Sequence, residues 1–284
     1  SIQHIDDALA TLADAGHIST TEAETTGEQI TRVPDLEECV ADADFVTEAV
    51  AEDLEIKRAV FDRLDDLAPD DAILATNTSG LSIDDIGAPV DDQGRVIGTH
   101  WFNPPYIVPL VEIVKGSETR DGPVESTYDL LESVSKTPVI VEKDIPGFIG
   151  NRIQAAMSYE AFSLLERGVA TPEDIDRAVK AGFGFRLPIM GIFEKMDQSG
   201  LDIHHEVEKQ LMADLDRGTE PNAVVTELLE RGETGTQTGK GVYDWTGVDV
   251  DAIKRERDQA LLSLYDTYRE ALSQESPEAN YDRT

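Results

Sequence analysis

Basic residues and cysteine are scarce in this chain. Only 24 of its 284 residues are Lys or Arg, against 58 Asp and Glu, and the formal net charge is −34 at pH 7. A surface with this excess of negative charge repels phosphate backbones and anionic lipids, so we expect neither nucleic acid nor a membrane as a partner. The single cysteine, Cys39, excludes a disulfide within the chain.

Long apolar runs are absent too. No stretch of about 18 apolar residues occurs, and the chain does not open with a charged and then apolar leader. We therefore expect a cytoplasmic protein. Because 40% of the 284 residues are hydrophobic, and the chain is longer than one ordinary core requires, we expect two folded domains rather than a disordered acidic chain.

The acidic residues are spread along the whole chain, and only nine residues are Lys. This composition is typical of proteins from salt-loving cells, where dense salt screens the repulsion between like charges. We predict that the thermal unfolding midpoint rises between about 0.1 M and about 3 M KCl, because the screening length falls from ~10 Å to below ~3 Å over that range. A midpoint that stays constant would contradict the prediction.

The first half of the chain alternates between strand-like and helix-like segments. Strands are expected at residues 44–50, 72–76, 95–101, 110–114 and 138–141, and helices at 1–15, 54–67 and 124–135, with a short helix that begins at Ser82. Strands that alternate with helices in this way indicate a mainly parallel sheet covered by helices.

Strand patterns end near residue 143. Apolar residues then keep helical spacing from Phe148 to Leu165, Thr171-Pro172 is typical of a helix start, and further helical segments are expected over 187–214, 222–231 and 251–273. We therefore divide the chain into an α/β domain at 1–143 and an all-helical domain at 144–284.

The segment from Gly98 to Lys115 carries the most chemical information. His100 ends an expected strand, a turn follows, and Glu112 lies among apolar residues of the returning strand. A carboxylate buried in such a strand needs a partner, because burying it alone is costly. His100 is the candidate partner, and a His held by a carboxylate is a suitable general base. From spacing alone, a structural His and a solvent-facing Glu remain the alternative.

This segment resembles the motif of the 3-hydroxyacyl-CoA dehydrogenase family. That motif consists of a His, then Asn-Pro three residues later, then Leu-Val-Glu with its Glu twelve residues after the His, as at His100, Asn103-Pro104 and Leu110–Glu112 here. Further blocks agree in order, at residues 48–57, 75–79, 146–153, 172–176, 200–202 and 238–243. The resemblance runs from the first helix to Trp245, and seven ordered blocks are far more specific than one motif.

The resemblance implies an NAD-dependent enzyme that interconverts (S)-3-hydroxyacyl-CoA and 3-oxoacyl-CoA in fatty-acid β-oxidation or butanoate metabolism. His100 is then expected to take the proton of the 3-hydroxyl while hydride passes to NAD, and Glu112 to orient the imidazole. Asn151 and Ser79 are expected to hydrogen-bond the reacting oxygen or the thioester carbonyl. The resemblance also implies a homodimer formed through the helical domain.

Glu52, Lys57, Ser79 and Asn103 match the cofactor contacts of the family. Without the family pattern, these residues are ordinary helix-start acids, solvated lysines and loop or cap residues. No metal site is expected: His204 and His205 are adjacent in an expected helix, and adjacent helical positions point about 100° apart.

The chain departs from the family pattern in two respects. It has no strand followed by Gly-x-Gly-x-x-Gly, the turn that holds the pyrophosphate, so we expect an incomplete Rossmann-type doubly wound sheet. Without that segment we expect these 284 residues alone not to transfer hydride. In addition, residues 1–30 contain no Lys or Arg, where acyl-CoA members carry lysines near the nucleotide phosphates.

Three interpretations follow for the function. Thr238–Trp245 is more typical of acyl-CoA members, and we favour an acyl-CoA substrate. The Asn103–Tyr106 and Pro109–Glu112 segments also resemble relatives that oxidise small polar hydroxy acids such as gulonate or carnitine. The third interpretation, from a different class, is a shortened, non-catalytic binding module.

Overall fold

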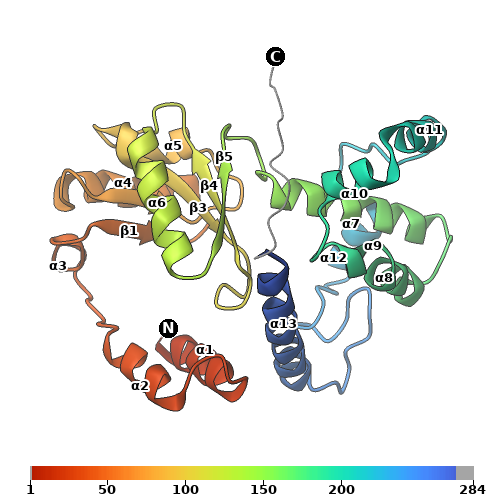
Figure 1. Cartoon of the computed structure of the whole chain (residues 1–284), viewed down its shortest axis with the longest axis horizontal. Coiled ribbons are helices and arrows are strands. Elements are labelled where there is room, and N and C mark those ends of the chain that lie inside the picture. The colour runs from red at the N-terminus through yellow and green to blue at the C-terminus, as the bar shows by residue number, and fades with distance from the viewer. Residues whose placement is uncertain (1, 273–284) are drawn as a thin grey trace. The chain divides into compact units, whose positions relative to one another are not determined.

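The computed structural model describes residues 2–272 and divides into two compact units, Ser1–Gln154 and Ala155–Thr284 (Figure 1). The first unit is built on one sheet and the second is helical. This agrees with the expected fold class, an incomplete Rossmann-type sheet followed by an all-α part.

The sheet has five strands in the order β1-β2-β3-β4-β5. Their bounds lie close to the expected ones: β1 Phe45–Glu48, β2 Ile73–Thr76, β3 Val96–Trp101, β4 Leu110–Lys115 and β5 Thr137–Val141. Only the β3–β4 pair is antiparallel, and its register places His100 directly opposite Glu112. The carboxyl ends of β1, β2 and β3 therefore lie at one edge of the sheet, where sheets of this kind bind ligands.

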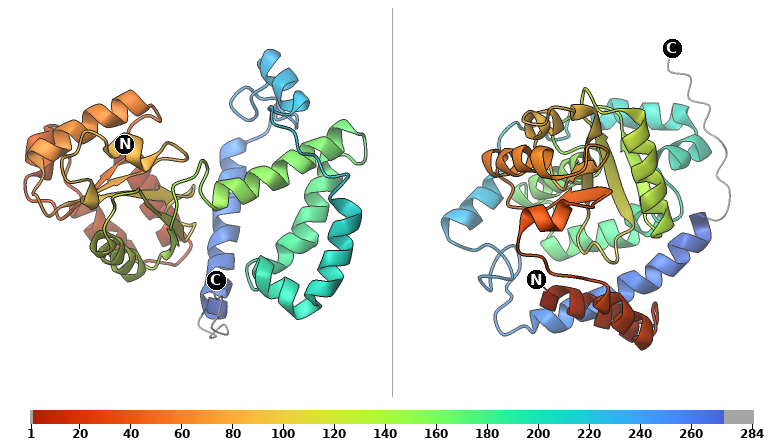
Figure 2. Two further views of the ribbon diagram at one scale, coloured as in Figure 1. Left: turned by 90° about the horizontal axis from the view of Figure 1, so that it is seen from above. Right: turned by 90° about the vertical axis from the view of Figure 1, so that its left-hand side faces the viewer.

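Helices cover both faces of the sheet, as the right-hand view of Figure 2 shows. The helices of this unit are α1 (Ile2–Asp14), α2 (Thr20–Glu28), α3 (Leu36–Val40), α4 (Leu54–Leu67), α5 (Ile83–Gly87) and α6 (Asp121–Ser133). Phe61 of α4 and Ile86 of α5 pack with Leu74 on one face, whereas Val124 and Leu131 of α6 belong to the core on the other face. Strand side chains alternate between these two cores, as the period of a strand requires.

The short helix α2 was not expected from the sequence. Helix α2 contains few apolar residues, so it has no clear hydrophobic period, and it packs against α1. Its start is stabilised by a capping box in which Ser19 accepts from the Glu22 N–H and Glu22 accepts from the Ser19 N–H. Asp35 caps α3 in a similar way by accepting from the Glu38 N–H.

The second unit consists of helices and connecting segments throughout its described part. Its helices are α7 (Gly150–Glu166, which begins in the first unit), α8 (Pro172–Ala181), α9 (Phe183–Arg186), α10 (Ile192–Ser199), α11 (Leu201–Leu211), α12 (Ala223–Glu230) and α13 (Val250–Leu272). Thr171 caps α8 with Pro172 at its first position, as expected. The helical stretch expected at 187–214 is interrupted between α10 and α11 at Gly200, whose φ is 94°.

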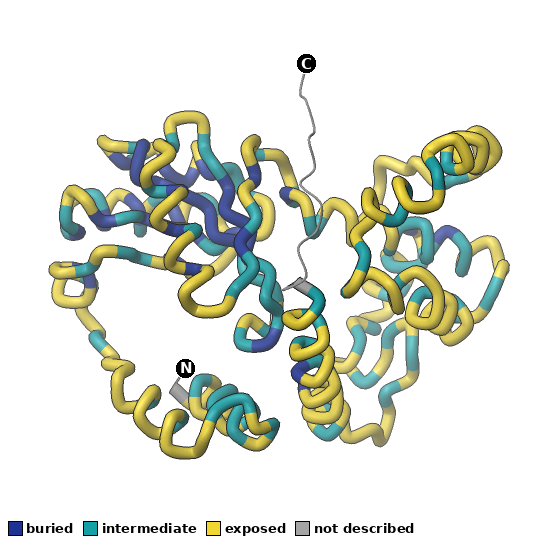
Figure 3. The backbone as a smooth tube through the Cα atoms, in the orientation of Figure 1, coloured by how far each residue is buried: buried dark blue, intermediate teal, exposed yellow. Residues whose placement is uncertain are grey.

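The two units differ in burial. Figure 3 shows buried residues concentrated in the sheet and exposed residues along most of the second unit. Between residues 2 and 272, no helix is both long and apolar enough to cross a membrane.

Candidate active site

His100 and Glu112 form a buried pair across the antiparallel strands β3 and β4. The imidazole Nδ1 lies 2.7 Å from Glu112 Oε2, and the two residues are only 5% and 1% exposed. A carboxylate can only accept, so Nδ1 carries the proton of this hydrogen bond. Nε2 is then the ring nitrogen that can accept a proton. A general base requires this tautomer, with Nδ1 protonated and Nε2 free of a proton.

The second carboxylate oxygen of Glu112 is bound by backbone. Oε1 accepts from the N–H groups of Ile149 and Gly150 at 2.9 and 2.8 Å. Burial alone would raise the pKa of the Glu112 carboxyl, but the hydrogen bonds from His100, Gly150 and Ile149 outweigh burial and hold the pKa below its ordinary value of 4.5. Glu112 is therefore a fixed negative charge at neutral pH, suited to stabilise a protonated imidazole.

We predict a pH-dependent effect of Glu112→Gln on stability. A group whose pKa is lowered by folding stabilises the protein above its unfolded pKa, and this contribution is lost as the pH falls through the folded pKa. The variant should therefore have a free energy of unfolding about 1–3 kcal/mol lower than wild type at about pH 7, with the difference shrinking below about pH 4.5. Urea unfolding in molar KCl measures both values.

Glu142→Gln is the matched control for this measurement, because the Glu142 side chain is 52% exposed and its ion pair with Lys115 is long, at 3.5 Å. We expect that control to stay within about 0.5 kcal/mol of wild type. A Glu112→Gln difference that is the same at about pH 3 and pH 7 would argue against the lowered pKa.

Ser79 lies in a loop that follows β2 and is fixed by Glu52. Glu52 Oε1 accepts from the Thr78 hydroxyl at 2.6 Å and from the Ser79 N–H at 2.8 Å. Burial opposes ionisation of Glu52, but the bonds from Thr78 and Ser79 and the charge of Lys57 lower its pKa. Asn151, at the start of α7, donates to the Ser79 carbonyl at 3.2 Å. The structure thus brings Glu52, Ser79 and Asn151 into one hydrogen-bonded group.

The Lys57 side chain is buried next to Glu52 of this hydrogen-bonded group. Its side chain is 0% exposed, and its ammonium donates to both oxygens of Glu48 at 2.9 and 3.0 Å and to the Asn77 carbonyl at 3.2 Å. It also lies 3.5 Å from Glu52 Oε2. An enclosed ammonium has no surface for a ligand, so the Lys57 charge acts on Glu48, Glu52 and the Asn77 carbonyl rather than on a molecule in solvent.

Sequence analysis did not single out Glu48 or Thr76. Glu48 is 4% exposed at the end of β1, and its Oε2 also accepts from the Thr76 hydroxyl at 2.7 Å. In the sequence, Glu48 is one of 58 acidic residues, and the nine-residue spacing to Lys57 matches no helical or strand period. The available signal was chemical: an acid at the end of a buried strand needs a cation, and lysine is rare in this chain.

Asn103 stands at the start of the turn between β3 and β4, where it is exposed. Lys136 stabilises the turn, because its ammonium donates to the carbonyls of Pro105 and Val108. Burial lowers the pKa of Lys136. Asn103 is therefore exposed to solvent on a turn that Lys136 stabilises, two residues after the end of β3.

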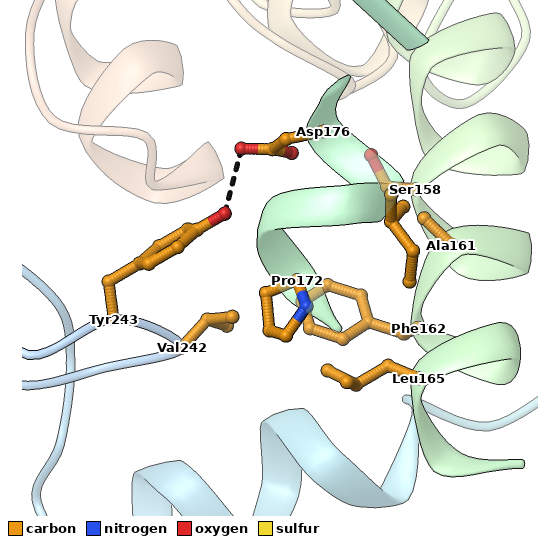
Figure 4. A pocket seen from close by; sticks show the side chains of 9 residues that line it. Ser158, Ala161, Phe162, Leu165, Pro172, Asp176, Val242 and Tyr243 are labelled. Carbon is orange, nitrogen blue, oxygen red and sulfur yellow. Dashed lines mark hydrogen bonds between the residues drawn. The ribbon is translucent and has the colours of Figure 1, made fainter. Parts of the chain in front are cut away.

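A separate pocket of about 240 Å³ lies in the helical unit (Figure 4). Helices α7 and α8 and the segment around Tyr243 provide its mostly apolar lining, which consists of Ser158, Ala161, Phe162, Leu165, Pro172, Ile175, Asp176, Val242 and Tyr243. The Tyr243 hydroxyl donates to Asp176 at 3.0 Å, and burial together with this carboxylate raises the pKa of Tyr243. None of the candidate site residues lines this pocket.

Two family models match the chain. The model described as 3-hydroxyacyl-CoA dehydrogenase, NAD binding domain, matches residues 1–145, and the model described as 3-hydroxyacyl-CoA dehydrogenase, C-terminal domain, matches residues 147–245. The chain belongs to the 3-hydroxyacyl-CoA dehydrogenase family. It is therefore related to NAD-dependent oxidoreductases, and its cofactor is NAD.

The relatives differ in their substrates. The chain is 36% identical over 230 residues to the 5-formyl-3-hydroxy-2-methylpyridine 4-carboxylate 5-dehydrogenase of Mesorhizobium japonicum, covering 81% of this chain and 74% of that one. It is 37% identical over 229 residues to the mitochondrial hydroxyacyl-coenzyme A dehydrogenase of Sus scrofa, covering 78% and 70%. A crystal structure of 5-formyl-3-hydroxy-2-methylpyridine 4-carboxylic acid 5-dehydrogenase matches with a TM-score of 0.81 at 35% identity, covering 84% and 77%.

The described residues fit part of an NAD site. Glu52, Ser79 and Asn103 follow the carboxyl ends of β1, β2 and β3, and all three are exposed there. Exposed polar groups at this edge of a mainly parallel sheet are what a dinucleotide contacts. Strand β1 pairs only with β2 in the described part of the chain, and no strand in that part is followed by the glycine-rich turn.

Proposed function

We propose that the protein interconverts (S)-3-hydroxyacyl-CoA and 3-oxoacyl-CoA with NAD, in fatty-acid or butanoate metabolism in the cytoplasm. The observation that carries this proposal is the buried His100–Glu112 pair at the ligand-binding edge of the sheet. It supplies a general base whose tautomer is fixed by a buried carboxylate. Membership of the family supplies the NAD chemistry.

His100 performs the proton transfer in this proposal. Its Nε2 takes the proton of the substrate 3-hydroxyl as the C3–O bond becomes a carbonyl, and it returns that proton in the reverse direction. Bound NAD+ would supply the acceptor for the hydride that leaves C3. Glu112 keeps Nδ1 protonated and stabilises the imidazolium that forms, because its lowered pKa keeps it charged.

Ser79 and Asn151 orient the substrate in this proposal. They are tied to each other by the bond from the Asn151 amide to the Ser79 carbonyl. A pair that is fixed before binding loses little freedom when it hydrogen-bonds the reacting oxygen or the thioester carbonyl, and such positioning contributes to rate. Glu52 and Asn103 are assigned to the cofactor side, with Lys57 supporting Glu52 from beneath.

A small polar or aromatic hydroxy acid is the second candidate substrate. Two observations favour it: helix α1 and helix α2 contain no Lys or Arg that could bind the phosphates of CoA, and the relative from Mesorhizobium japonicum is named for a pyridine carboxylate. A non-catalytic binding module is less well supported, because the His100–Glu112 pair is assembled as a base requires.

The test is a comparison of kcat/KM among substrates for the protein expressed from its complete gene in molar KCl. We expect NADH-dependent reduction of acetoacetyl-CoA to exceed oxidation of carnitine, gulonate and 5-formyl-3-hydroxy-2-methylpyridine 4-carboxylate by at least about a hundredfold in kcat/KM. The reverse order would replace the acyl-CoA proposal with the hydroxy-acid one. No turnover of any of these compounds would favour the binding module.

We also propose a homodimer formed through the helical unit. Large apolar side chains are exposed on α9, α10 and α11, among them Phe185 (77%) and Phe193 (83%). Exposed apolar surface of this extent on one unit is typical of an interface between subunits.

We predict that Phe185→Asp/Phe193→Asp shifts the mass measured by light scattering from a dimer to a monomer, whereas Leu130→Asp on α6, 43% exposed, leaves a dimer. A wild-type monomer at micromolar concentration would contradict the proposal.

A further inference from the structure

The His100 ring is enclosed by two phenyl rings. The Phe102 ring centroid lies 4.6 Å from that of His100 at an interplanar angle of 52°, and the Phe148 centroid lies at 5.6 Å and 61°, an edge-type arrangement. Phe148 is 1% exposed. These distances and tilts are those of favourable aromatic pairs. The imidazole thus contacts two aromatic rings in addition to its Nδ1 hydrogen bond.

Phe148 reaches His100 because the chain bends sharply before α7. Gly147 has a φ of 79° and Phe148 a φ of 51°, and a positive φ is unfavourable for a residue with a large side chain. The Phe148 N–H is bonded to the Ile145 carbonyl at 3.0 Å. The same bend directs the next two N–H groups at Glu112 Oε1. One strained turn therefore contacts both members of the pair.

Gly150 provides space for the second ring. A Cβ on Gly150 would lie 2.5 Å from Cζ of Phe102 and 3.2 Å from its nearer Cε. The first distance is closer than carbon atoms approach without displacement, so any larger residue would push Phe102 from its place beside His100. The Phe102 ring thus contacts His100, and its Cζ end lies close to Gly150.

We propose that Phe102 and Phe148 are positioning residues that clamp the plane of the His100 imidazole, and that Gly150 is required because it leaves room for Phe102. The proposal rests on the proposed function, in which His100 is the base. The hydrogen bond to Glu112 fixes one ring atom, whereas the torsion that sets the ring plane is soft. These two rings, together called the clamp, fix that plane, and they therefore fix the direction from which Nε2 approaches the substrate hydroxyl.

Kinetics of three Phe→Leu variants test the clamp. We expect Phe102→Leu and Phe148→Leu to lower kcat for acetoacetyl-CoA reduction at least about tenfold while changing KM for NADH less than about twofold, because a misaimed base affects the chemical step. Phe61→Leu is the matched control: Phe61 of α4 is 0% exposed in the core, so the variant loses the same atoms at a residue that is not part of the His100–Glu112 site. A kcat for Phe102→Leu and Phe148→Leu equal to that of Phe61→Leu would overturn the clamp.

The role of Gly150 has its own test. Gly150→Ala should lower kcat at least about tenfold, because the added methyl displaces Phe102. In Gly150→Ala/Phe102→Leu the shorter side chain leaves room for the methyl, so the double variant should be no slower than Phe102→Leu alone. If the two losses multiply instead, Gly150 does not act through Phe102, and this part of the proposal is wrong.

A spectroscopic measurement tests the positioning role of Phe102 and Phe148 independently of the proposed function. The Nδ1–H proton of His100 should give a sharp, slowly exchanging imidazole signal in wild type and Phe61→Leu, identified by its loss in His100→Gln. It should broaden or exchange with water in Phe102→Leu and Phe148→Leu. This measurement needs no substrate, so failure of the dehydrogenase assay leaves it intact. An unchanged signal in both variants would overturn the clamp even if the enzyme assay succeeds.

Discussion

His100→Gln is expected to lower kcat for acetoacetyl-CoA reduction by at least about a hundredfold, the usual loss when a general base is removed. Gln has a similar length but cannot take up a proton, so it retains packing and loses the chemistry. NADH affinity should change little, because His100 is not assigned to hold the nucleotide. Steady-state kinetics and NADH fluorescence titration measure the two quantities.

Two further variants complete this experiment. Glu112→Gln should give a loss of similar size, since it leaves His100 less well oriented and its cation without a counter-charge. His205→Gln is the control, because the His205 side chain is 65% exposed on α11. Turnover of His100→Gln at the level of this control would refute the assignment of the base, and clearly weaker NADH binding would move His100 to the cofactor site.

Lys57→Met is expected to lower the free energy of unfolding by about 3–5 kcal/mol. Removing one partner of a buried ion pair leaves the other charge uncompensated, and Glu48 is 4% exposed. The Lys57 ammonium contacts Glu48 at 2.9 Å, so the carboxylate would lose its counter-charge. Denaturant unfolding in molar KCl measures the loss.

A double variant distinguishes the lost pairing from lost volume. Lys57→Met/Glu48→Gln removes the buried charge along with its partner, so it should recover at least about half of the loss. Lys180→Met is the control, because Lys180 is 79% exposed and its contact with Asp176 is long, at 3.8 Å. A double variant less stable than Lys57→Met would mean that the charges of Glu48 and Lys57 are not the cause of the instability.

Much of the sheet could be predicted from the sequence because its signals are local. Alternation and short apolar runs located all five strands, and the helical period located α4 at its observed bounds, Leu54–Leu67. For His100 and Glu112, the hairpin and the need of a buried acid for a partner made a pair possible but left a structural His and a solvent-facing Glu open, and the resemblance to the family decided for the pair. The structure places these two residues directly opposite each other.

Contacts between segments distant in the sequence could not be predicted. The Ile149 and Gly150 N–H groups lie 37 and 38 residues from Glu112, and backbone donors leave no trace in residue types. The enclosure of Lys57 depends on how α4 packs on β1 and β2, which composition does not set. Helix α2 was missed for a different reason: its residues are mostly polar, and its capping box lacks the apolar run that usually follows one.

The most direct test of the account follows deuterium from NADH labelled at its transferable position into acetoacetyl-CoA, with protein expressed from the complete gene in molar KCl. The account predicts 3-hydroxybutyryl-CoA that carries the label at C3, formed by wild type and at least about a hundredfold more slowly by His100→Gln. Label that appears at equal rates in both proteins would contradict it. So would label that is transferred only when the keto form of a carnitine-type hydroxy acid or a pyridine compound is offered for reduction in place of acetoacetyl-CoA.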